Sequence, residues 1–84
     1  MQFTDYLFQY HKRGDHGVSY EISDKDETGT TKYYGYLSSD GAWIIMEWDT
    51  VTDQFRYAGG SELYAAAWTG RAGLTYGYYN ALQL

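Results

Sequence analysis

Residues 33–57 contain three short runs of aromatic and β-branched residues, and polar or Gly-containing segments separate them. The breaks fall at Asp40-Gly41 and at residues 49–53. Runs of this composition, bounded by Gly and Asp, are typical of strands in an antiparallel meander. Asp-Gly also favours a two-residue hairpin loop, because a type I′ turn needs positive φ at both central residues. The pattern therefore predicts three consecutive antiparallel strands.

The lengths of the two predicted loops set the register of these strands. A two-residue loop at Asp40-Gly41 places Leu37 opposite Ile44, and a four-residue loop at residues 50–53 places Glu47 opposite Arg56. Side chains alternate across a strand, so this register predicts one face with Tyr33, Leu37, Ile44, Met46, Trp48, Phe55 and Tyr57. The other face then carries Tyr34, Tyr36, Trp43, Ile45, Glu47 and Arg56.

Both predicted faces carry large apolar side chains, whereas a sheet with one solvated face alternates apolar and polar residues. Either the chain covers both faces or another molecule covers one of them. From the shared faces we predict a structural core of Tyr33, Leu37, Trp48, Phe55, Tyr57, Tyr64 and Trp68. We predict a subunit interface formed by Tyr34, Tyr36, Trp43 and Ile45. If the two faces are inverted, Ile44 and Met46 take that place.

The rest of the chain predicts one helix and several less defined segments. Ser61 is a suitable N-cap for a helix over residues 61–70, with Tyr64 and Trp68 on one face. Residues 18–22 predict a short strand and residues 23–31 an exposed polar loop. Residues 1–17 fit an extended arm or a short helix, and residues 74–79 fit a strand or a helix. We expect one small domain, residues 1–84, of the α+β class but mainly β: an antiparallel meander of three to five strands with one short helix after the third meander strand.

Composition limits the classes of partner. The chain has 84 residues and no Cys, so its core is small and has no disulfide. Eleven Tyr, three Trp and three Phe are many for such a core, and these residue types are common at interfaces. The net charge of −5, with scattered Lys and Arg, disfavours direct nucleic-acid binding and anionic membranes. The N-terminus does not match the pattern of a signal peptide.

No catalytic, cofactor or metal site is predicted. Asp24-x-Asp26-x-Thr28-Gly29 matches the first half of an EF-hand loop, but Gly35 stands where that loop needs a bidentate Glu. A solvated acidic loop is therefore the favoured interpretation. His11, Asp15 and His16 are close in sequence, yet an exposed turn is favoured over a metal site. No nucleophile is paired with a His base at a recognisable spacing, so we do not expect an enzyme.

Three spaced motifs resemble a known group of proteins. The motifs are Trp43-x-Ile45-x-x-Trp48-Asp49-Thr50, Tyr57-Ala58-x-Gly60 and Tyr64-x-x-x-Trp68-x-x-Arg71-Ala72-x-Leu74-x-Tyr76. They resemble small proteins and C-terminal segments encoded by tailed bacteriophages and associated with virion tail, fibre or decoration genes. The resemblance covers about half of the chain, within residues 33–76, and the positions that match are mostly aromatic and structural. Ile44 and Met46 depart from it, because that pattern has polar residues there.

The resemblance implies a non-enzymatic structural subunit of a tailed-phage virion, made in the host cytoplasm and present in many copies. Its partners would be further copies of itself, other virion subunits, or both, held through an aromatic-rich sheet face. Two alternatives remain open at this point. One is a glycan- or receptor-binding module, because exposed Tyr and Trp also stack on sugar rings. The other is an acidic intracellular phage protein that inhibits a host protein.

Overall fold

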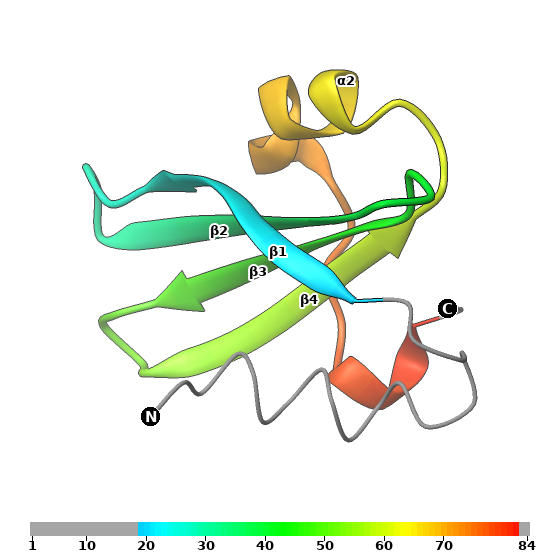
Figure 1. Ribbon diagram of the computed structural model, residues 1–84. Helices are drawn as coiled ribbons and strands as arrows, with labels where there is room; N and C mark the ends of the chain where they lie inside the picture. The colour runs from blue at the N-terminus through cyan, green and yellow to red at the C-terminus, as the bar shows by residue number, and fades with distance from the viewer. Residues whose placement is uncertain (1–18, 83–84) are drawn as a thin grey trace.

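A four-stranded antiparallel sheet forms the centre of the computed structural model, which describes residues 19–82. Its strands follow chain order: β1 (Tyr20–Asp26), β2 (Thr31–Ser38), β3 (Trp43–Asp49) and β4 (Gln54–Gly60). A short helix, α2 (Tyr64–Thr69), comes next, followed by the 3₁₀ turns η2 (Arg71–Gly73) and η3 (Tyr79–Ala81) (Figure 1). The predicted fold class, a mainly β meander with one short helix after it, is confirmed.

The first strand is longer than the sequence pattern predicts. It continues through Ser23 and Asp24 to Asp26, so only residues 27–30 connect it to β2. β1 is an edge strand, and edge strands carry charged side chains that discourage pairing with other chains. The polar composition that predicted a loop is therefore compatible with a strand. The predicted arm or helix at residues 1–17 lies outside the described residues.

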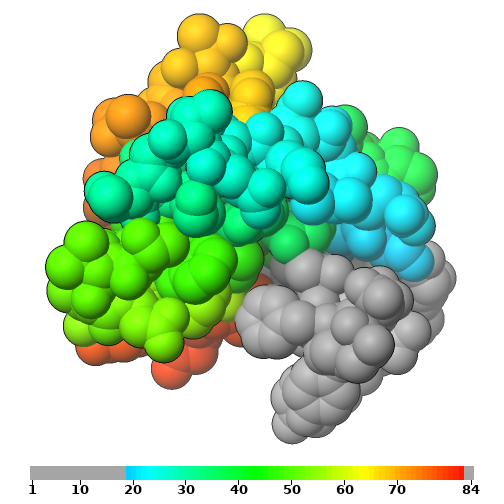
Figure 2. Space-filling view, turned by 90° about the vertical axis from the view of Figure 1, so that its left-hand side faces the viewer, coloured from blue at the N-terminus to red at the C-terminus, as the bar shows by residue number. Residues whose placement is uncertain are grey.

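The pairing of β3 with β4 has the predicted register. Trp48 lies opposite Phe55, and Glu47 lies opposite Arg56, with a four-residue loop between the strands. Asp53 ends this loop with a φ of 60°, a left-handed conformation that Asp adopts more readily than most residues. In the space-filling view this loop lies beside the β1–β2 loop (Figure 2). The Thr50 backbone N–H joins the two loops by donating to the Thr30 carbonyl at 3.0 Å.

The predicted register of β2 against β3 is wrong by one residue. Leu37 lies opposite Trp43, and Tyr36 lies opposite Ile44. The loop has three residues rather than two: Ser38 pairs with Ala42, and Gly41 donates to the Ser38 carbonyl at 3.1 Å. Gly41 has a φ of 97°, as expected for a type I turn that ends in a glycine bulge. A slip of one residue moves every β2 side chain to the other face.

The two faces of the sheet therefore have a different composition from the predicted one. Helix α2 covers the first face, where Trp43, Ile45 and Ala58 form a buried cluster with the helix residues Tyr64, Ala67 and Trp68 against it. The chain then passes the β4 edge, where Gly77 and Tyr57 exchange two backbone hydrogen bonds of 2.8 and 2.9 Å. It continues to η3 at the second face, as Figure 1 shows. There, Tyr79 and Leu82 pack against a second buried cluster, which consists of Tyr36, Ile44, Met46 and Tyr57.

The helix packs as predicted but begins later. Tyr64 and Trp68 lie against the sheet, whereas the N-cap is Leu63, without a side-chain hydrogen bond, and not Ser61. The Glu62 carbonyl accepts a hydrogen bond of 2.5 Å from Trp43 Nε1, so the segment before the helix is tied to β3. Residues 74–79 form neither a full strand nor a helix, because only Gly77 pairs with β4 before η3 begins.

Candidate functional site: an aromatic pocket

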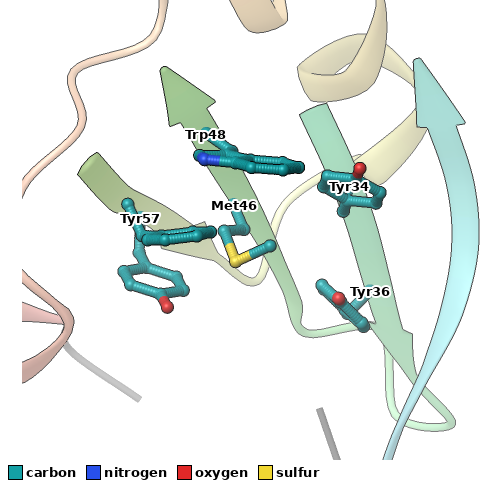
Figure 3. Close-up of a pocket in the computed structure, with 6 residues that line it drawn as sticks. Tyr34, Tyr36, Met46, Trp48 and Tyr57 are labelled. Atoms are coloured by element: carbon teal, nitrogen blue, oxygen red, sulfur yellow. The ribbon is translucent and has the colours of Figure 1, made fainter. Parts of the chain in front are cut away.

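The second face of the sheet carries an apolar pocket of about 370 Å³. We call it the aromatic pocket, and its lining consists of Tyr34, Tyr36, Met46, Trp48, Phe55 and Tyr57. Three adjacent strands supply these side chains. Figure 3 shows Met46 in the middle of the site, with the rings of Tyr34, Tyr36, Trp48 and Tyr57 around it.

Strand pairing explains why these side chains meet. Tyr34, Met46 and Tyr57 lie directly opposite one another across β2, β3 and β4. Trp48, two residues after Met46, and Phe55, two residues before Tyr57, form the next row on the same face. Directly opposed side chains on one face of a sheet have Cβ atoms about 5 Å apart, which is close enough for contact. The meander therefore assembles five rings and one thioether on one surface.

Ring contacts fix the walls of the pocket. Trp48 and Phe55 are stacked, with centroids 5.4 Å apart and planes at 12°. Tyr57 meets Tyr79 of η3 edge to face, with centroids 5.0 Å apart and planes at 76°. Such pairs stabilise their arrangement by roughly 0.5–1.5 kcal/mol beyond the burial of area. The pocket walls are thus held by contacts within the chain before any ligand is present.

Two carboxylates lie at the polar ends of these rings. Tyr34 Oη donates to Glu27 Oε2 at 2.6 Å, and Trp48 Nε1 donates to Asp53 Oδ1 at 3.0 Å. Burial, followed by the bond to Glu27, raises the pKa of Tyr34 to about 12. The same bond is the main reason that the pKa of the Glu27 carboxyl is lowered. At neutral pH, Tyr34 is therefore a neutral donor and Glu27 an anionic acceptor.

Among residues 19–82, those that line the pocket include no Asp, Glu, His, Cys, Lys, Arg, Ser or Thr side chain. Its polar atoms are phenol hydroxyls and one indole N–H, and the pKa of Tyr36 and Tyr57 is raised by burial. Such a surface binds by ring contact and by exclusion of water. Apolar groups, flat rings and organic cations fit this chemistry.

The opposite face holds a second cluster, centred on Arg71. Its guanidinium donates to Asp26 Oδ2 at 2.7 Å and to the Trp68 carbonyl at 2.7 Å. The guanidinium carbon also lies 4.4 Å from the centroid of the Trp68 ring and 5.6 Å from that of Tyr33. These contacts join η2, β1 and α2, so the cluster serves the fold.

The acidic stretch that resembles an EF-hand loop is occupied by internal contacts. Asp26 also accepts from Thr28, through the backbone N–H at 3.1 Å and the hydroxyl at 2.7 Å. Asp24 accepts from Tyr64 Oη at 2.9 Å. Within residues 19–82, no three side chains of the His, Cys, Asp and Glu types are grouped as metal ligands would be. His11, Asp15 and His16 lie outside the described residues.

The structure separates the four residues of the predicted interface. Tyr34 and Tyr36 belong to the aromatic pocket, whereas Trp43 and Ile45 are buried on the helix-covered face, with exposed fractions of 7% and 0%. Met46, from the alternative set, lies beside Tyr34. Ile44 belongs to the pocket face but is fully buried.

The predicted core residues also divide between the two faces. Tyr33, Leu37, Tyr64 and Trp68 pack under the helix, and Tyr57 is buried on the pocket face. Trp48 and Phe55 line the pocket, and Phe55 is 36% exposed. The aromatic composition of the strands indicated these residues, but only the observed register brings the six pocket residues together.

Comparison with known proteins adds no relationship. No protein-family model matches the chain, and no curated protein or solved structure matches it significantly. Among the described residues, no helix has the length and apolar character needed to cross a membrane.

Proposed function

We propose that this protein is a non-enzymatic structural subunit of a tailed-phage virion, present in many copies, which assembles through the aromatic pocket. The pocket is the observation that carries this proposal, because Tyr34, Trp48 and Phe55 remain partly exposed around the buried Tyr36, Met46 and Tyr57 and form an apolar surface suited to protein contact. The phage setting rests on the motifs between Trp43 and Tyr76. The neighbouring subunit would place a side chain in the pocket.

The composition of the pocket favours a protein partner. Aromatic residues and Met are enriched in the centres of protein interfaces, where they bury large areas at a small cost in conformational entropy. Binding energy also tends to concentrate in a few Trp, Tyr and Arg side chains that fill pockets. Trp48 and Phe55 suit this role because their stacked rings need little ordering when a partner binds.

A glycan-binding module is the second candidate, and the same stack supports it. Sugar rings bind to flat aromatic surfaces, and Trp48 and Phe55 are nearly parallel, at 12°. Sugar recognition also needs polar groups for the hydroxyls. At this site Tyr34 Oη and Trp48 Nε1 already donate to carboxylates of the same chain. This use of the polar groups makes the protein partner the better supported of the two.

Two measurements test the proposal. Mass spectrometry of purified virions should find the protein, and light scattering should show a species larger than a monomer. Phe55→Asp should weaken assembly, because it would bury an unpaired carboxylate at the contact. Leu63→Asp is the matched control: Leu63 is 75% exposed, precedes α2 and gives the same change in charge.

Circular dichroism should show both variants folded. Absence of the protein from virions would refute the virion role. A wild-type protein that stays monomeric at high concentration, together with normal incorporation of the Phe55→Asp variant into particles, would refute the role of the pocket.

A further inference from the structure

We infer that the aromatic pocket recognises a positively charged side chain, Lys or Arg, presented by the neighbouring subunit. This inference rests on the proposed assembly function and names the chemistry of the contact. Assembly through the pocket, as proposed above, requires only that the neighbouring subunit places some apolar side chain there. The observations below favour a cation.

Aromatic rings form most of the pocket surface. The face of an aromatic ring is electron-rich, so a cation within about 6 Å of its centroid is attracted, and Trp gives the strongest effect. Trp48 lies at one end of this lining, next to Phe55 and one row from Tyr34 and Tyr57. A group that enters the pocket therefore meets several rings at once. Met46 adds a polarisable thioether at the centre.

The carboxylates at the rim strengthen this attraction. Glu27 accepts from the hydroxyl of Tyr34, and Asp53 accepts from the indole N–H of Trp48. Donation to an anion increases the electron density of the donating ring, so both rings attract a cation more strongly. Asp53 also adds negative potential beside Trp48, whereas Lys25 Nζ, 3.7 Å from Glu27 Oε1, offsets part of the charge of Glu27.

Two basic side chains on the strands that form the pocket are engaged outside it. Lys32 is the direct neighbour of Trp48 across the strands, but its Nζ donates to the Glu27 carbonyl at 2.9 Å. The Arg56 guanidinium donates to the Phe55 carbonyl at 2.9 Å, and its carbon lies 4.5 Å from the ring centroid of Tyr78. Neither side chain lines the pocket.

The same protein already shows this chemistry on its other face. There, Arg71 lies over Trp68 at 4.4 Å and beside Tyr33 at 5.6 Å, while Asp26 accepts its hydrogen bond. That arrangement combines aromatic rings with a carboxylate around one guanidinium. The aromatic pocket repeats the rings and the carboxylates.

Capped amino acids test the inference on the intact chain. N-acetyl-lysine methylamide and N-acetyl-arginine methylamide are titrated into ¹⁵N-labelled protein, and the Trp48 indole N–H is followed by NMR. N-acetyl-norleucine methylamide is the neutral control, because its side chain is a linear alkyl chain without the ammonium group. We expect the charged probes to bind roughly 5- to 30-fold more tightly than the neutral one, and added salt to reduce this difference.

Two variants localise the effect. Glu27→Gln should lower the preference for the charged probes, because the side chain remains an acceptor for Tyr34 but loses its charge. Glu62→Gln is the matched control: it removes one negative charge from an exposed position just before α2 and should leave the preference unchanged. Trp48→Leu, for which the backbone amide signals of β3 are followed instead of the indole, should abolish the preference.

The outcomes separate this inference from the proposed function. Equal affinity for the Lys and norleucine probes, or no shift of the Trp48 indole signal, would overturn the inference while assembly through an apolar contact could still hold. Equal losses in the Glu27→Gln and Glu62→Gln variants would also overturn it, since total charge would then explain the effect. A clear preference for cations in a protein that virions lack would support the inference and refute the virion role.

Discussion

Gly35 is the position at which a single added methyl group best tests the packing of the helix on the sheet. It lies in the middle of β2, buried beneath α2. A Cβ at this position would collide with the Tyr64 hydroxyl. It would also lie 3.0 Å from Tyr64 Cζ and 3.1 Å from Trp68 Cε3. Because Tyr64 Oη also bonds Asp24 at 2.9 Å, the ring cannot move away without disturbing that bond.

The expected magnitude follows from two opposing effects. Overpacking a well-packed site destabilises by roughly 1–3 kcal/mol. Replacing Gly by Ala within a strand offsets roughly 0.5–1 kcal/mol of this, because the unfolded chain loses conformational freedom. We therefore expect Gly35→Ala to lower the free energy of unfolding by about 1–2 kcal/mol. For a domain of this size, that corresponds to a fall in melting temperature of roughly 5–15 °C.

Urea unfolding followed by circular dichroism measures the change, with calorimetry for the melting temperature. Gly77→Ala is the control, because a Cβ there has no neighbour within 4 Å. This variant should be unchanged or more stable by about 0.4–1 kcal/mol. The two Gly→Ala variants should thus differ in sign.

A Gly35→Ala protein as stable as wild type would refute the packing of α2 on β2. The double variant Gly35→Ala, Tyr64→Phe gives a second check, since it removes the hydroxyl that the new methyl group would meet. Its destabilisation should be smaller than the sum of the two single effects. Strict additivity would mean that the two side chains do not meet.

Three further predictions concern the same framework. Trp68→Ala should destabilise by about 3 kcal/mol or more, because a large ring is lost between sheet and helix; an unchanged urea midpoint would place Trp68 outside the core. Hydrogen bonds from Thr28 and then Arg71 lower the pKa of Asp26 from 3.8 to about 2. Its stabilising effect should therefore be complete above about pH 4 and be lost as the pH falls towards 2. Melting curves of wild type and Asp26→Asn should converge over that range, and a constant difference would contradict the assignment. Millimolar calcium should give no heat in titration calorimetry, because Asp26 is already bonded and no bidentate Glu completes the loop; a saturable signal would overturn this.

The sequence alone determined the elements with strong local signals. Aromatic and β-branched runs placed the three meander strands, and the loop at residues 50–53 set the pairing of Glu47 with Arg56, as observed. The common face of Tyr64 and Trp68 predicted a helix that packs on the sheet, also as observed. These features depend on neighbours within a few residues, so the sequence pattern is sufficient to predict them.

Only the tertiary structure decided which residues share the aromatic pocket. Asp40-Gly41 is compatible with a two-residue turn and with the observed three-residue loop, and the two differ by one residue in register. In a sheet with one polar face, a slip of one residue would turn the apolar side chains of the strand towards solvent, so the wrong register would be unstable. Here both faces of β2 are rich in apolar side chains, so the pattern is nearly equivalent in either register. The packing of α2 against Gly35, which has no side chain to obstruct Tyr64 and Trp68, fits only the observed one.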